Sequence, residues 1–220
     1  MSGFVIDGRV PIWVDVRAGE GPVAVIVHDI GAPPIDVLGA DAPAFDAAAA
    51  HGPVLLPHLR GHGRSGTVRG GIYTLAEFAT DVVRVLRRTD APALLAGIGR
   101  GALVAAVAAA AAPTSVQALV LAPGDAAFPC GIEPREARLQ LFCELTTHGP
   151  SQPPASARTP EPLDPADRDL LWASVPRPVV WIGCPHGAWT AGAPADRVMD
   201  VIGRPLDDAL RLIVEVGRAD

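Results

Sequence analysis

Three glycines at every second position, Gly97, Gly99 and Gly101, could form a tight turn with a chemical role. The apolar run before them, residues 93–96, predicts a short buried strand, and the alanine-rich stretch after them predicts a helix. This is the spacing of a nucleophile elbow, G-x-S-x-G, in which a strained turn presents the central side chain. The central residue here is glycine, so we expect the turn without its nucleophile. Arg100 is expected to keep its backbone N–H in an oxyanion-binding position, and its side chain could bind a carboxylate or an enolate.

The elements that would position this turn alternate between strands and helices. Apolar alternation predicts an N-terminal hairpin over residues 4–18, and apolar runs predict buried strands at residues 22–27, 54–57, 93–96, 116–122, 177–183 and 210–216. Helices are predicted at residues 33–51, 74–86, 102–112, 164–174 and 195–202. This order predicts an α/β domain with a mostly parallel sheet, whose site lies at the carboxyl ends of its strands. Residues 126–165 interrupt the rhythm and are expected to form a lid or insertion.

Composition limits the classes of function. The chain has 220 residues, which fits one domain over residues 1–220, and 49% of them are hydrophobic without a run long enough for a membrane span. A net charge of −6 and no basic patch argue against nucleic acid as a partner. All 18 basic residues are arginine, which excludes a lysine Schiff base. Three cysteines without metal-ligand spacing, and no signal peptide, predict a cytoplasmic protein with no metal or cofactor.

Four stretches in order resemble the α/β-hydrolase superfamily, and the resemblance covers nearly the whole chain. They are Val-Ile-Val-His-Asp at residues 25–29, Pro-His-Leu-Arg-Gly-His-Gly-Arg-Ser-Gly at residues 57–66, the helix that follows at residues 73–86, and Leu-Ala-Gly-Ile-Gly-Arg-Gly-Ala at residues 95–102. The resemblance implies the α/β-hydrolase fold, with helices on both faces of the central sheet and a short lid insertion. The usual C-terminal helix is expected to be missing, because the chain ends soon after its last predicted strand.

The catalytic positions depart from the pattern of this superfamily. Gly99 stands at the nucleophile position, Cys184, Pro185 and His186 follow the strand that usually precedes the acid, and no histidine follows residue 216. A triad needs nucleophile, base and acid in mutual contact, so conventional serine hydrolysis is disfavoured. By position in the fold, the expected catalytic residues are His28, Asp29, Arg100 and His186. The expected binding residues are Ile30, Ile98, Gly99 and Asp125.

Asp29 is the most unusual of these residues, because the resemblance implies a glycine there that allows close backbone approach. A carboxylate at this point would repel an oxyanion, the opposite of what acyl transfer requires. Two roles stay open for Asp29, a general base or an ion-pair partner of Arg100. His28 also has two, a donor or base in the pocket or a structural histidine bonded to backbone.

Three hypotheses for function follow. The first is a noncovalent acid–base enzyme, of lyase, cyclase or isomerase type, that acts on a small apolar molecule, for example in secondary metabolism. The second is a non-catalytic pseudo-hydrolase that binds a ligand or assists another enzyme. Its partner would be a second copy of the chain in a homo-dimer or another protein, covering the sheet face left by the missing helix. The third is a hydrolase with a relocated catalytic group.

Overall fold

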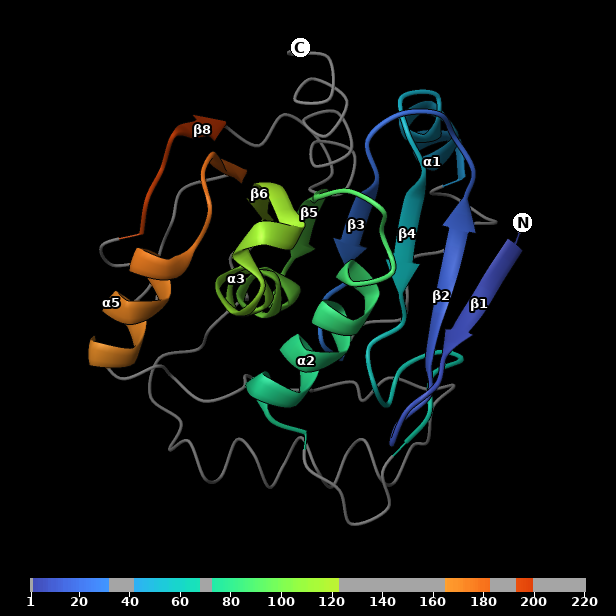
Figure 1. The fold of residues 1–220 in the computed structure, drawn as a ribbon, viewed down its shortest axis with the longest axis horizontal. Coiled ribbons are helices and arrows are strands. Elements are labelled where there is room, and N and C mark those ends of the chain that lie inside the picture. The colour runs from blue at the N-terminus through green and yellow to red at the C-terminus, as the bar shows by residue number, and fades with distance from the viewer. Residues whose placement is uncertain (1, 32–41, 68–72, 123–164, 183–192, 200–220) are drawn as a thin grey trace.

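A computed structural model describes residues 2–31, 42–67, 73–122, 165–182 and 193–199. Its strands form one eight-stranded sheet in the order β1-β2-β4-β3-β5-β6-β7-β8 (Figure 1). The strands are β1 (Ser2–Ile6), β2 (Ile12–Arg17), β3 (Ala24–Val27), β4 (Val54–Pro57), β5 (Ala93–Ile98), β6 (Val116–Ala122), β7 (Val179–Ile182) and β8 (Arg197–Met199). The pairs β1–β2 and β2–β4 are antiparallel, and all other neighbours are parallel.

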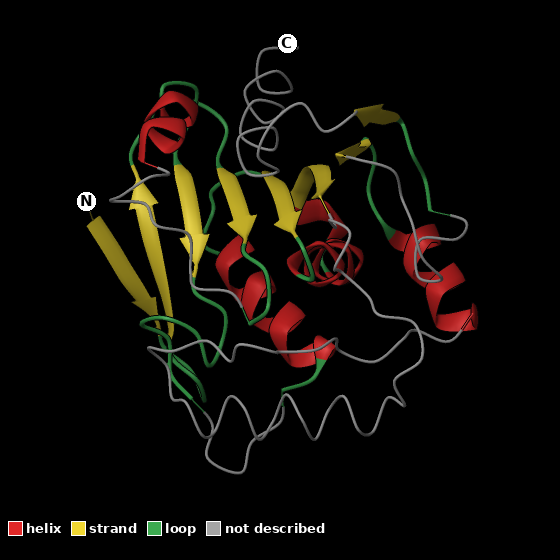
Figure 2. Cartoon of the chain, turned by 180° about the vertical axis from the view of Figure 1, so that it is seen from behind, coloured by secondary structure: helices red, strands yellow, loops and turns green. Residues whose placement is uncertain are grey.

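Helices cover both faces of this sheet. They are α1 (Ala42–Ala49), α2 (Leu75–Leu86), α3 (Gly101–Ala111) and α5 (Pro165–Ser174), with a short 3-10 turn at Pro113–Ser115. Figure 1 shows α2, α3 and α5 in front of the sheet, and Figure 2 shows the strands from the opposite side.

Alternating side chains of the central strands build two separate cores. Val25 and Val27 of β3 join the larger core beneath α2, α3 and α5, whereas Ala24 and Ile26 join a smaller one that includes Phe45 of α1. Because strand side chains alternate between faces, a strand covered on both sides reads as a continuous apolar run. This is the pattern from which the sequence predicts β3 and β4.

A charged network ties α2 to the loop after β4. Thr74 caps the helix by accepting the Glu77 amide. Arg60 donates from Nε and Nη2 to the two carboxylate oxygens of Asp81, at 2.6 and 2.9 Å, and also pairs with Glu77. Asp81 is 1% exposed, so this pair fixes the loop that precedes the helix against its buried side.

Within the described residues, the predicted strands and helices agree with the structure except near the end of the described chain, and the first part of the helix predicted at residues 33–51 lies outside these residues. The helix predicted at residues 195–202 is wrong, because Arg197–Met199 forms β8 and pairs in parallel with β7. Asp196 anchors this strand, since its Oδ2 accepts the Val179 amide at 2.6 Å. The lid predicted at residues 126–165 lies almost wholly outside the described residues, and the strand predicted at 210–216 and the C-terminus lie outside them entirely. No helix among the described residues is long and apolar enough to span a membrane.

Candidate functional site

The turn between β5 and α3 has the conformation of an elbow. Gly99 has a φ of +58°, in the left-handed region that favours glycine. Its amide donates to the Ala122 carbonyl at 2.8 Å, and its own carbonyl accepts the Ala102 amide at 3.1 Å, where α3 begins. The turn therefore joins the ends of β5 and β6 to the first turn of the helix.

The loop after β3 lies directly against this turn. In the parallel pair of β3 and β5, Val27 is opposite Gly97, so Asp29 and Gly99 lie two residues beyond the same rung. Gly101 permits the close approach, because a Cβ on it would overlap the carbonyl oxygen of His28. Strand register and one glycine together bring the Asp29 side chain over the elbow.

Asp29 occupies the place next to Gly99 that an elbow nucleophile would need. A Cβ added to Gly99 would overlap Cγ of Asp29 and lie 2.8 Å from its Oδ1. The same Oδ1 accepts the Arg100 backbone amide at 2.7 Å and its Nε at 3.0 Å. The ion pair with Arg100, one of the two roles open from the sequence, is therefore formed, and the amide expected to bind an oxyanion is already hydrogen-bonded to an anion.

The pair is only partly shielded from solvent. The Asp29 side chain is 33% exposed and that of Arg100 is 14% exposed. Among the described residues, no group donates to the second carboxylate oxygen, Oδ2. One oxygen is thus held in place, the other accepts no hydrogen bond from the described residues, and the pair as a whole carries no net charge.

His28 and His62 hold the two loops beside the pair. The Leu59 amide donates to Nε2 of His28 at 3.0 Å, so the ring proton lies on Nδ1, which donates to the Asp29 carbonyl at 2.8 Å. The Gly31 amide donates to Nε2 of His62 at 2.8 Å, and Nδ1 of His62 donates to the Arg60 carbonyl at 2.9 Å. Both rings therefore use both nitrogens on backbone groups.

Burial keeps both imidazoles neutral. Desolvation lowers the pKa of His28 well below its ordinary value, and the neighbouring His62 lowers it further. Desolvation lowers the pKa of His62 from 6.5 to about 4, and the nearby Arg100 adds to this effect. The two ring centroids lie 5.0 Å apart. Neutral rings next to a neutral ion pair leave this part of the site without net charge at pH 7.

A third histidine of this region is also bonded to its surroundings. His58 accepts the Arg64 amide on Nδ1 and donates from Nε2 to the buried Asp15 at 2.8 Å. The Ser65 hydroxyl donates to the His58 carbonyl, so this serine is tied to the backbone. These contacts favour a structural role for His58 and for Ser65.

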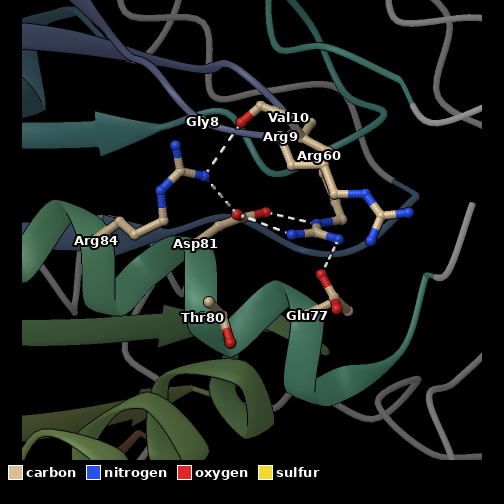
Figure 3. A pocket seen from close by; sticks show the side chains of 8 residues that line it. All are labelled: Gly8, Arg9, Val10, Arg60, Glu77, Thr80, Asp81 and Arg84. Carbon is tan, nitrogen blue, oxygen red and sulfur yellow. Dashed lines mark hydrogen bonds and ion pairs between the residues drawn. The ribbon is translucent and has the colours of Figure 1, made fainter.

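The structure also has a cavity of about 190 Å³ between the β1–β2 turn and α2, and its lining does not include Asp29 or Arg100. Figure 3 shows that the side chains of Arg60, Glu77, Asp81 and Arg84 point toward one another, whereas no dashed line joins Arg9 to them. Arg60 and Arg84 both bind Asp81, and Arg84 also donates to the carbonyls of Ile6, Asp7 and Val10. The four charged residues of the lining that point toward one another therefore belong to the hydrogen-bond network that anchors α2.

The structure brings Asp29, Gly99 and Arg100 together as expected. His28 lies beside them, but its ring nitrogens contact the backbone, and its catalytic role stays a prediction that these contacts do not favour. Ile30 is fully buried in the larger core, and Ile98 packs on the smaller one. Asp125 and His186 lie outside the described residues. His62 was missed, because a histidine within a glycine-rich loop carries no pattern that places its ring.

Comparison with known proteins identifies the fold. No family model and no curated protein matches the sequence. A thioesterase domain from the curacin biosynthetic pathway is 17% identical, with a TM-score of 0.72 over 100% of this chain and 99% of its own. A hydrolase from Pseudomonas aeruginosa is 19% identical, with a TM-score of 0.67 over 96% and 98%. A bottromycin epimerase bound to bottromycin A2 is 22% identical, with a TM-score of 0.62 over 99% and 97%.

The chain has the α/β-hydrolase fold. Proteins similar to it in structure include hydrolases, a thioesterase domain and an epimerase, so this fold carries more than one kind of chemistry. A fold does not by itself determine a reaction, and function must be argued from the residues of the site. Within the described residues, the elbow carries no nucleophile at Gly99, and the Asp29 carboxylate beside it is hydrogen-bonded to the Arg100 amide.

Proposed function

We propose that this protein is a noncovalent acid–base enzyme of lyase, cyclase or isomerase type, in which Asp29 is the proton acceptor. The observation that carries the proposal is the position of its carboxylate, beside Gly99 in the space of the missing nucleophile. One oxygen is fixed by two donors of Arg100, and the other accepts no hydrogen bond from the described residues. An oriented carboxylate with one available oxygen is a suitable general base.

The same geometry opposes acyl transfer through the elbow. An oxyanion hole stabilises negative charge that develops on a substrate oxygen. Here the Arg100 amide donates to Oδ1 of Asp29, so a substrate oxygen would have to displace a carboxylate. It would also develop negative charge close to an existing one, which costs free energy in a poorly solvated site.

Arg100 complements Asp29 during proton transfer. When Oδ2 takes a proton from a C–H bond next to a carbonyl, the electron pair of that bond stays on the substrate as an enolate. Asp29 then becomes neutral, and the guanidinium that had paired with it is free to stabilise the new anion. Return of the proton completes an isomerisation, and loss of a leaving group completes an elimination.

The surroundings of Asp29 suit a neutral substrate. The ion pair and the two neutral histidines add no net charge, so nothing in the described site attracts a strongly charged ligand. The similarity to an epimerase supports the isomerase form of the proposal, because removal and return of a proton is one route by which a carbon next to a carbonyl is epimerised. We therefore favour a small, mostly apolar molecule with an acidified C–H bond.

The Asp29–Arg100 pair also favours a second candidate, a non-catalytic ligand binder. A partly buried carboxylate with two donors from one arginine is a stable arrangement that needs no reaction to explain it. The two candidates differ in one measurable way, because a binder would be stabilised by its ligand and return it unchanged.

The test starts from small molecules of cells with and without the gene. Purified protein is added to the extract of the deletion strain, and the compounds that accumulate there are followed by mass spectrometry. We expect one compound to be converted by the protein alone. The enzyme proposal fails if accumulated compounds bind, raise the melting temperature and stay unchanged, which is the result expected of the binder.

A further inference from the structure

The Asp29 loop is held by imidazoles rather than by regular secondary structure. Two backbone groups of this loop, the Asp29 carbonyl and the Gly31 amide, bond to the rings of His28 and His62. The second nitrogen of each ring bonds to the loop after β4, at Leu59 and Arg60. Each ring therefore links the loop that carries the acid–base residue to the loop that the Arg60–Asp81 pair fixes against α2.

We propose that His62, together with His28, is a positioning residue that holds Asp29 over the elbow, and that it does so only as a neutral imidazole. This inference rests on the proposed role of Asp29 but concerns a different residue. Nε2 of His62 must accept the Gly31 amide, and a protonated ring has no acceptor left. Protonation would place two N–H groups face to face and release Gly31, two residues from Asp29.

Desolvation is the main effect that disfavours the protonated form of His62. The ring is fully buried, and its centroid lies 5.0 Å from that of His28 and 6.3 Å from that of the apolar Phe78 of α2. Arg100 also opposes a positive charge there, whereas the backbone hydrogen bonds to Arg60 and Leu59 and the charge of Asp29 favour one without outweighing desolvation. Burial thus keeps the ring in the state that the Gly31 contact requires at neutral pH, and acid below a pKa of about 4 would remove that state.

Two substitutions separate positioning from simple packing. His62→Gln keeps an oxygen acceptor near the place of Nε2 and does not titrate, whereas His62→Phe keeps a ring of similar shape without an acceptor. At pH 7, we expect hydrogen-exchange protection of the Gly31 amide to stay within about threefold of wild type in the Gln variant. In the Phe variant the protection of this amide should fall at least about tenfold, which is the effect expected for the loss of one hydrogen bond.

The amide resonance of Arg100 reports whether Asp29 moves as well, because this amide donates to Oδ1. It should shift in the Phe variant and return toward its wild-type position in the Gln variant. An unchanged Arg100 amide in a folded Phe variant would overturn the positioning role, and so would full protection of Gly31. Once a substrate is known, the Phe variant should lower kcat more than it raises KM, and the Gln variant should restore kcat.

An acid titration gives a readout that does not depend on the Phe variant folding. In the Asp29→Asn protein, where this carboxylate cannot titrate, the Gly31 amide should shift together with the His62 ring between pH 6 and about 3.5, around the His62 pKa of about 4. If the chemical shift of the Gly31 amide does not follow the titration of the His62 ring, the inference is contradicted. If Gly31 follows His62 but Asp29→Asn still converts substrate, the positioning contact stands and the proposed function fails instead.

Discussion

At the scale of single residues, Asp29 and Gly99 must be considered together. The carboxylate fits over the elbow only because residue 99 has no side chain, and the positive φ of this residue also favours glycine. Any side chain at position 99 therefore meets two obstacles, a strained backbone and the Asp29 carboxylate. Only the overlap with the carboxylate depends on Asp29, so its cost in stability can be measured separately from the cost of the strained backbone.

We expect Gly99→Ala to lower the free energy of unfolding and to weaken the Asp29–Arg100 contact. The left-handed backbone alone costs about 1–2 kcal/mol for alanine, and the overlap with Asp29 adds to it. Urea denaturation of the single variants and of Asp29→Gly/Gly99→Ala forms a double-mutant cycle. The cost of alanine should be smaller when Asp29 is absent. An equal cost in both backgrounds would mean that the side chain of Asp29 does not occupy this space.

The sequence predicts that Asp29 and Arg100 are possible partners, but it does not predict the geometry of their contact. It offered two roles for Asp29, and the choice depends on the neighbourhood of β3 and β5, which are separated by about 70 residues in the chain. Once Val27 is known to face Gly97, the meeting of Asp29 with the elbow follows. The place of His62 could not be predicted, because its ring contacts depend on the path of two loops.

At the scale of elements, α2 is anchored by a buried ion pair that the loop after β4 supplies. Arg60 and Asp81 are 6% and 1% exposed, whereas Glu77, the other partner of Arg60, is 40% exposed. A buried charge that loses its partner is strongly destabilising, but an exposed pair contributes little. Substitution of Asp81 is therefore expected to change stability strongly, and substitution of Glu77, which pairs with the same arginine, serves as the matched control.

Asp81→Asn should lower the free energy of unfolding by about 3–5 kcal/mol, because it leaves the Arg60 guanidinium buried without a full counter-charge. Glu77→Gln should cost less than about 1 kcal/mol. Chemical denaturation of the two variants at one pH and salt concentration provides the comparison. Similar costs for both would show that the burial of Asp81 does not govern the strength of the network.

The buried histidines predict how stability depends on pH. The pKa of His62 is about 4 in the folded protein and near 6.5 when unfolded, so the unfolded state binds more protons between these values. The contribution of His62 is complete above pH 6.5 and is lost as the pH falls toward 4, by about 3 kcal/mol at 1.36 kcal/mol per pKa unit.

Denaturation of wild type and His62→Gln at several pH values between 7 and 4 tests this expectation. The wild type should lose stability faster than the Gln variant over that range, because glutamine does not titrate. Parallel curves would contradict a depressed pKa for His62, whatever the stability of the two proteins at pH 7.

At the scale of the whole molecule, apolar patterning predicted the strands of the sheet well. The strand at residues 116–122 has the predicted bounds, because its apolar run is buried almost throughout. The sequence predicts a helix in place of the short β8, because three residues are too few to show a period and the position of this strand depends on pairing with β7. The period of apolar residues indicates which face of a segment is buried. It does not predict a short strand that forms only because it pairs with a neighbouring strand.

The fold explains why the sequence limits the classes of reaction but does not identify the reaction. The chain has the α/β-hydrolase fold, and a mostly parallel sheet of this kind favours a site at the carboxyl ends of its strands, here β3 and β5. Under the proposed function, the reaction depends on two residues, the aspartate at position 29 and the glycine at position 99. These two residues convert a place for a nucleophile into a place for a fixed carboxylate.

The central claim, that this carboxylate moves a proton, is tested most directly by isotope exchange. The compound that the protein converts is incubated in D₂O with wild type, with Asp29→Asn, and with Asp46→Asn as a control at an aspartate that pairs with Arg17 at the surface. Deuterium gained at carbon is measured by mass spectrometry.

We predict rapid exchange with wild type and with the Asp46 control, and a rate at least about 100-fold lower with Asp29→Asn, the usual scale of a general base. Equal exchange rates in a folded Asp29→Asn protein and in wild type would contradict the account.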